Sequence, residues 1–244
     1  MRWVRRIALV LLLSVGGLVL SGAYLGYRLS HPSAEDFHPQ VQITGRALRE
    51  ALERVPAQRY LLGFHYQDTW STCGPASLRN ALLSLGADVD SERALFGEDR
   101  LAWWRALGLG MTLDELAALA RANTPHAVEV LRPANLDAFR AILDDANEPD
   151  TRLIVNFDRA PVFGVSVGHF SPIGGYEAAT GWVTLLDVTE GYGFSLVPDT
   201  LLLQATRMAD PVSGRARGVL RIVAPQASAD RPMPRGFWAQ LRFR

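Results

Sequence analysis

Three residue types that together can perform thiol catalysis occur in this chain in a suggestive order. Cys73 is the only cysteine among 244 residues. His169 lies in the segment Gly-His-Phe-Ser-Pro-Ile-Gly-Gly-Tyr, and Asp187 follows it by eighteen residues. A thiol becomes a strong nucleophile when an imidazole takes its proton, and a carboxylate beside that imidazole fixes its orientation and tautomer. The order predicts one active site that contains all three residues.

Gln67, six residues before Cys73, is the predicted oxyanion residue. Its side-chain amide and the backbone N–H of Cys73 can together bind a developing negative oxygen. Each of these residues has a simpler interpretation when taken alone: a surface glutamine, a buried cysteine, a core histidine or a turn aspartate. The combination of the four favours catalysis. The small residues of Gly74-Pro75-Ala76-Ser77 add to this, because they let a substrate carbonyl approach the thiol.

The segments around these residues resemble the phytochelatin synthases, over about residues 58–210. The nine-residue histidine segment is nearly identical to the one that surrounds the catalytic histidine of that family. Cys73 to Leu78 matches the family's Cys-Gly-x-Ala-Ser-Leu, and Leu186-Asp187-Val188 matches its Leu-Asp-Val. The resemblance implies a papain-like cysteine-protease fold, with a helical lobe and an antiparallel sheet lobe. It also implies a reaction with glutathione, in which the cysteine is acylated by γ-Glu-Cys and glycine is released.

The same resemblance implies further residues that touch the substrate. Arg159, ten residues before His169 in Phe157-Asp158-Arg159, matches a family arginine and is a candidate for binding a substrate carboxylate. A surface arginine at a strand end is the alternative. Gly74 and Ser171, from the two matching segments, are the other predicted substrate-binding residues.

Two departures from the family pattern leave alternatives open. The chain has no cysteine-rich C-terminal region, so hydrolysis of the acyl-enzyme is expected to dominate over transfer to a second glutathione, as in the short bacterial members. Pro75 stands where the family usually has leucine, and Cys-Gly-Pro-Ala is similar to the bacteriocin-processing peptidases. An endopeptidase that cuts a leader peptide is therefore the second hypothesis, and a non-catalytic module that binds a thiol or peptide is the third.

Composition excludes several other classes of function. The formal net charge is zero, which argues against nucleic acid as a partner. All 25 basic residues are arginine, which excludes lysine-based chemistry. A single cysteine permits neither an internal disulfide nor a cysteine-rich metal site. We therefore expect no bound metal and no tightly bound cofactor, and any dependence on Cd²⁺ or Zn²⁺ would act through the metal–glutathione thiolate as substrate.

Residues 1–28 are predicted to be a signal anchor or transmembrane segment. Arg2, Arg5 and Arg6 precede an uncharged, mostly apolar run over 7–27, about the length that spans a bilayer core. The arginines predict a cytoplasmic N-terminus, and hence a single-pass protein of the inner membrane with its catalytic domain outside the cytoplasm. The alternative is a cleaved signal peptide and release into the periplasm.

The remaining chain predicts an α+β domain over 41–224, between a linker over 29–40 and a poorly ordered tail over 225–244. Strands over 169–176 and 181–188 flank a turn and form a hairpin, so His169 and Asp187 can face each other. The predicted helices cover 43–54, 75–85, 112–123, 135–144 and 201–208. The other predicted strands cover 152–157, 194–197 and 218–223, and 60–66 is expected to be a strand or loop.

Overall fold

The computed structural model describes residues 31–225 and seven residues before them. The seven are Trp3, Gly16, Gly17, Ser21, Tyr24, Gly26 and Tyr27. The predicted anchor over 7–27 and the predicted tail beyond 225 therefore fall almost wholly outside the described residues. Among the described residues, no helix combines the length and the apolar character needed to cross a membrane.

A six-stranded antiparallel sheet forms the centre of the domain. The strands are β1 (Ala127–Leu131), β2 (Thr151–Asp158), β3 (Gly168–Glu177), β4 (Trp182–Leu186), β5 (Phe194–Pro198) and β6 (Gly218–Val223). Their order across the sheet is β1-β6-β2-β3-β4-β5, and each neighbouring pair is antiparallel. Together with the helices, this confirms the predicted α+β class.

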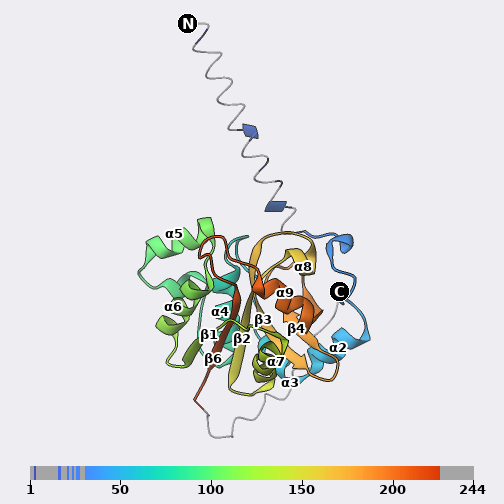
Figure 1. Ribbon diagram of the computed structural model, residues 1–244. Helices are drawn as coiled ribbons and strands as arrows, with labels where there is room; N and C mark the ends of the chain where they lie inside the picture. The colour runs from blue at the N-terminus through green and yellow to red at the C-terminus, as the bar shows by residue number, and fades with distance from the viewer. Residues whose placement is uncertain are drawn as a thin grey trace.

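Helices cover both faces of this sheet (Figure 1). They are α2 (Arg46–Glu53), α3 (Val55–Leu61), α4 (Cys73–Ser84), α5 (Arg100–Leu109), α6 (Leu113–Asn123), α7 (Leu136–Asp144), α8 (Ala160–Phe163) and α9 (Asp199–Arg207). On one face α4 and α6 pack on the strands, and on the other α7 and α9 do so.

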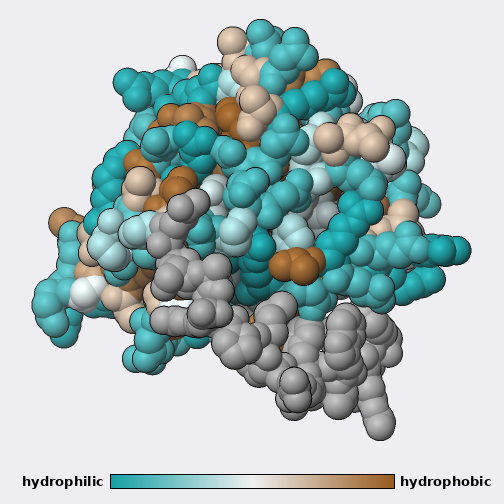
Figure 2. All heavy atoms as spheres, turned by 90° about the horizontal axis from the view of Figure 1, so that it is seen from below, coloured by the Kyte–Doolittle hydropathy of each residue, from teal (hydrophilic) through white to brown (hydrophobic). Residues whose placement is uncertain are grey.

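Two hydrophobic cores lie on the two sides of the sheet. Successive side chains of a strand point to opposite faces, and β2 is buried on both. Ile154 accordingly packs in the core beneath α4, while Leu153 and Val155 pack in the core beneath α7 and α9. The surface seen from below is mostly hydrophilic, with its hydrophobic side chains in small groups (Figure 2).

Several elements differ from the sequence prediction, among them the short helix α8, which was not predicted. Residues 60 and 61 belong to α3, because Pro56 in its first turn favours a helix that continues into the expected strand or loop. Helix α5 was not predicted: Leu101 and Trp104 are 80% and 67% exposed, so its apolar residues do not mark a buried face. Strand β1 was also not predicted, since it is a short, half-exposed strand at the sheet edge.

The helix that carries the thiol begins at Cys73 itself, two residues earlier than predicted. Pro75 therefore lies in its first turn, where a missing N–H costs nothing. Gly86, with φ of +86°, follows the helix end as expected for a glycine that reverses the chain. The predicted capping box of the next clear helix is also present, because Thr112 and Glu115 bond each other's backbone N–H groups.

Candidate active site

Cys73, His169 and Asp187 meet at one end of the sheet. Cys73 is the first residue of α4, His169 is the second residue of β3, and Asp187 directly follows β4. Helix α4 packs on β3, which brings the thiol next to the imidazole. His169 Nε2 lies 3.0 Å from Asp187 Oδ1. All three side chains are buried, and Asp187 is fully inaccessible.

His169 Nε2 has two charged neighbours of opposite sign. Asp187 accepts the backbone N–H of Thr189 at 2.7 Å and two bonds from Arg159 at 2.8 Å. Burial raises the pKa of Asp187, but the charges of Arg159 and His169 outweigh burial and hold it at about 2. A carboxylate can only accept from Nε2, whereas the Arg159 guanidinium, 2.9 Å from the same nitrogen, can only donate to it. In the imidazolium both ring nitrogens carry protons, so Nε2 donates to Asp187 and Nδ1 can exchange a proton with the thiol.

The thiol and the imidazole favour each other's charged forms. Burial disfavours the Cys73 thiolate, yet the charge of His169 and a hydrogen bond from it outweigh burial and lower the pKa of Cys73. Burial and the Arg159 cation disfavour the imidazolium, but the Asp187 carboxylate and the Cys73 thiolate raise the pKa of His169 above its ordinary value. The position of Cys73 at a helix N-terminus adds to this effect. The arrangement supports a thiolate–imidazolium pair.

Arg159 lies in this cluster but is already engaged. Its guanidinium bonds both oxygens of Asp187 and the Thr189 hydroxyl, and lies 3.7 Å from the centre of the Tyr192 ring. The side chain is 3% exposed. All of these hydrogen bonds come from Nη2, and Nε is buried without a hydrogen-bond partner among the described residues. The contacts support a role in holding Asp187.

Gln67 lines a small cavity of about 20 Å³ together with His169 and Arg159. Its backbone N–H donates to the carbonyl of Val188 at 2.8 Å, which ties Gln67 to the segment that carries Asp187. The side-chain Oε1 is buried without a hydrogen-bond partner. The structure thus brings together all four predicted catalytic residues, and their roles remain predictions.

A pocket of about 270 Å³ opens beside Cys73. Apolar side chains at its rim include Trp70, Leu109 and Val212, which are 60%, 77% and 69% exposed. Two buried ionic side chains, Asp210 and Arg217, lie in its wall. A pocket with an apolar rim and a few buried charges suits a small, polar substrate.

Sequence analysis missed Arg217, which precedes β6 and carries no motif. Its guanidinium makes only long contacts, 3.6 Å to Asp158 and 3.4 Å to Asn156, and Nε is buried without a partner. Gly168 leaves the space that this guanidinium fills, because a Cβ there would collide with it. The only sequence signal is thus a glycine before His169 whose steric role depends on a residue 49 positions away.

The two other predicted substrate-binding residues do not line this pocket. Gly74 is buried, and a Cβ on it would meet the side chains of Phe170 and Leu116 rather than open space. Ser171 is fully buried in β3, and its hydroxyl has no hydrogen-bond partner. Gly74 therefore lets α4 pack closely on Phe170 of β3, whereas Ser171 pairs with Val155, which lies in the core on the opposite face of the sheet.

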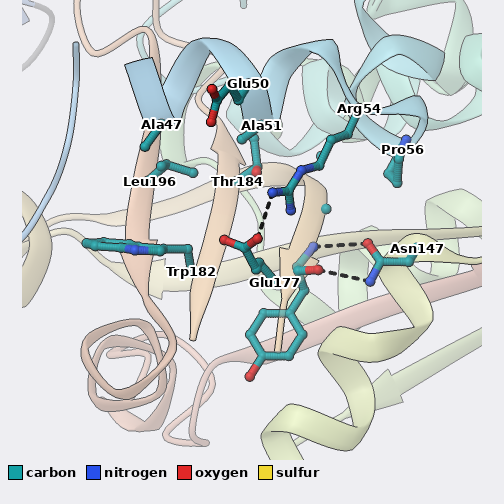
Figure 3. Close-up of a pocket in the computed structure, with 13 residues that line it drawn as sticks. Ala47, Glu50, Ala51, Arg54, Pro56, Asn147, Glu177, Trp182, Thr184 and Leu196 are labelled. Carbon is teal, nitrogen blue, oxygen red and sulfur yellow. Dashed lines mark hydrogen bonds and ion pairs between the residues drawn. The ribbon is translucent and has the colours of Figure 1, made fainter. Parts of the chain in front are cut away.

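A larger hollow, about 380 Å³, lies at the other end of β3 and contains none of the predicted site residues. Figure 3 shows its wall, where Arg54 pairs with Glu177 at 2.6 Å and the Asn147 side chain bonds the backbone beyond β3's bulge. These polar groups already satisfy one another. Size alone therefore does not mark the site of chemistry here.

In the part of the chain that the structure describes, no three His, Cys, Asp or Glu side chains are grouped so that they could hold a metal ion. The expectation that metals act through the substrate stays a prediction.

Comparison with known proteins identifies the family. The family model described as "Phytochelatin synthase" matches residues 39–219. This chain belongs to the phytochelatin synthase family. The match includes Cys73, His169 and Asp187 as well as Gln67.

Curated relatives in this family are enzymes. "Glutathione gamma-glutamylcysteinyltransferase 1" of Triticum aestivum is 40% identical over 75% of this chain and 39% of its own length. "Glutathione gamma-glutamylcysteinyltransferase 2" of Arabidopsis thaliana is 30% identical over 84% of this chain and 48% of its own length. The chain thus spans less than half the length of these relatives.

Among solved structures, the peptidase domain of Streptococcus ComA, a bifunctional ABC transporter involved in quorum sensing, is similar at 15% identity. The similarity covers 66% of this chain and 97% of that domain, with a TM-score of 0.45.

Proposed function

We propose that this chain is a papain-like thiol enzyme that cleaves glutathione and forms a γ-glutamylcysteinyl thioester on Cys73. The observation that carries the proposal is the meeting of Cys73, His169 and Asp187 beside a pocket of about 270 Å³ with two buried ionic side chains. The family's curated members are named for this acyl transfer.

The first half of the reaction forms the thioester. The Cys73 thiolate attacks the carbonyl carbon between the cysteine and glycine of glutathione, and the carbonyl oxygen becomes an oxyanion. The Gln67 side-chain amide and the Cys73 backbone N–H stabilise that oxygen. His169 then gives its proton from Nδ1 to the glycine nitrogen, the C–N bond breaks, and glycine leaves.

The second half releases the acyl group. His169, now neutral, takes a proton from the attacking nucleophile, and the thiolate leaves as the tetrahedral intermediate collapses. Water as nucleophile gives γ-glutamylcysteine, and the α-amino group of a second glutathione gives a phytochelatin. We propose that water is the main acceptor, and that Cd²⁺ or Zn²⁺ acts only by binding the substrate's thiol.

The pocket supplies charges that match the γ-glutamyl end of glutathione, which carries a free amino group and a free carboxylate. Arg217 can bind the carboxylate and Asp210 the ammonium group. Asp210 accepts the Val212 N–H at 2.9 Å and the Ser213 hydroxyl at 3.1 Å, which fixes it in place. We therefore assign to Arg217 the carboxylate-binding role that the sequence suggested for Arg159.

Arg217→Leu is expected to lower kcat/KM for glutathione by about 10- to 150-fold, since one charge-assisted hydrogen bond is worth about 1.5–3 kcal/mol. Steady-state glycine release measures the effect. Arg215→Leu, which removes an exposed arginine two residues away, is the matched control and should change little. An unchanged kcat/KM in folded Arg217→Leu protein would refute the assignment.

The proposed function is tested by incubating the purified protein with glutathione, with and without Cd²⁺ or Zn²⁺, and measuring free glycine. Release that requires Cys73 supports it. If folded protein releases no glycine under any of these conditions, the proposal fails. Acylation of Cys73 by an extended peptide and not by glutathione would favour an endopeptidase instead.

We also propose that residues 7–27 anchor the enzyme in the inner membrane, with the catalytic domain on the outer side. The support is the apolar run and the three arginines before it. A periplasm-active reporter fused after Gln40 should be active, whereas activity of only a cytoplasm-active reporter would overturn the topology. Protein with an intact N-terminus in the membrane fraction would show an uncleaved anchor, whereas a shortened N-terminus would show a cleaved signal peptide.

A further inference from the structure

Glu92 is a buried acidic residue that the reaction described above does not use. It is 1% exposed, although acidic side chains are seldom buried without partners. It directly precedes the 3-10 helix η2 (Arg93–Phe96), which packs on α4, the helix that begins with Cys73. The partners of its carboxyl therefore lie close to the thiol site.

The carboxyl of Glu92 contacts both ends of one short loop. Oε1 accepts the backbone N–H of Asp68 at 2.8 Å. The hydroxyl of Thr72 also lies beside the carboxyl. Asp68 directly follows Gln67, and Thr72 directly precedes Cys73. One side chain thus braces the segment between the oxyanion glutamine and the nucleophile.

The hydrogen bonds to Glu92 come from the two ends of this loop. Both the Asp68 N–H and the Thr72 hydroxyl favour the ionised carboxylate, because each donates to it. Among the described residues, Glu92 Oε2 is buried without a further hydrogen-bond partner.

Burial and the Asp68 charge raise the pKa of Glu92 to about 7. The hydrogen bonds from Thr72 and Asp68 and the Arg79 cation act in the opposite direction. Asp68 and Arg79 are the charged groups that act on it. The folded-state pKa exceeds the ordinary value of 4.5. The stabilisation that Glu92 provides is therefore full below about pH 4.5 and is lost as the pH rises through about 7.

We propose that Glu92 is a positioning residue that braces the loop from Gln67 to Cys73, so that the Gln67 amide and the Cys73 N–H converge on the oxyanion. The inference rests on the thiol chemistry of the proposed function, but not on glutathione as the substrate.

Two reactions of Cys73 separate positioning from mere thiol reactivity. Acylation by p-nitrophenyl acetate passes through an oxyanion and needs the converging donors. Alkylation by iodoacetamide needs the thiolate but forms no oxyanion. Both rates follow the thiolate, so the ratio of acylation rate to alkylation rate reports the oxyanion donors alone.

Glu92→Gln keeps an acceptor for the Asp68 N–H, so its ratio of acylation rate to alkylation rate at pH 6 should stay close to that of the wild-type protein. Glu92→Leu leaves that N–H unpaired, and its ratio should be lower by about 10²-fold at pH 6, the cost of a lost oxyanion donor. Glu98→Gln, which neutralises an exposed acid in the same segment, should behave as wild type.

A ratio in Glu92→Gln as low as that in Glu92→Leu would overturn the inference. An unchanged ratio in Glu92→Leu would do so too, as would equal losses of acylation and alkylation, which indicate a purely structural residue. If the wild-type thiol reacts with the ester while glutathione releases no glycine, the proposed substrate fails and the role of Glu92 is still decided by the ratio.

Discussion

Cys73→Ser will abolish glycine release from glutathione, with a loss on the order of 10⁴-fold or more. His169 lowers the pKa of the Cys73 thiol and so favours the thiolate. A serine hydroxyl in the same place stays protonated and is a poor nucleophile without a site built for it. The variant changes one atom, so the pocket and its charges are retained.

The measurement is glycine release together with intact-protein mass after a short incubation with glutathione. Wild-type protein should gain the mass of one γ-glutamylcysteinyl group, and Cys73→Ser should gain none. Thermal unfolding of the two proteins is the control for folding. Glycine release that survives in Cys73→Ser would show that another group is the nucleophile.

His169→Ala should lower acylation by glutathione by about 10³- to 10⁴-fold, because the imidazole serves as the counter-ion of the thiolate and as the acid that protonates glycine. Without the imidazole, burial of the thiol is no longer offset. A smaller fraction of the thiol is then ionised at pH 6, so alkylation by iodoacetamide at that pH should also fall, at least tenfold.

The fold should tolerate this change. Asp187 keeps the guanidinium of Arg159 and the Thr189 N–H as partners, so no buried charge is left unpaired. His126→Ala, a half-buried histidine far along the chain from the site, is the matched control and should retain both rates. If the wild-type thiol fails to alkylate at pH 6, the non-catalytic binding module is favoured. The same holds if the thiol of His169→Ala alkylates as fast as that of the wild-type protein.

Local residue patterns were enough to predict much of this protein. The capping box at Thr112, the proline and glycine that bound α4, and strand β6 over 218–223 were all confirmed, because each depends on neighbours within a few residues. The two motifs around Cys73 and His169 were enough to indicate the family, and the family model bears this out. Short-range signals failed for α5 and β1, whose apolar residues are partly exposed.

Tertiary packing alone decided how the charges are distributed. Arg159 and Arg217 look alike in the sequence, yet one is held by Asp187 and the other lies in the wall of the pocket beside the thiol. Glu92 likewise resembles any surface acid until η2 packs on α4 and buries it against the Gln67–Cys73 loop. The physical reason is that the role of an ionic side chain depends on its burial and on its nearest opposite charge. Both are set by residues distant in the chain, whereas a helix cap or a strand is determined by residues next to it.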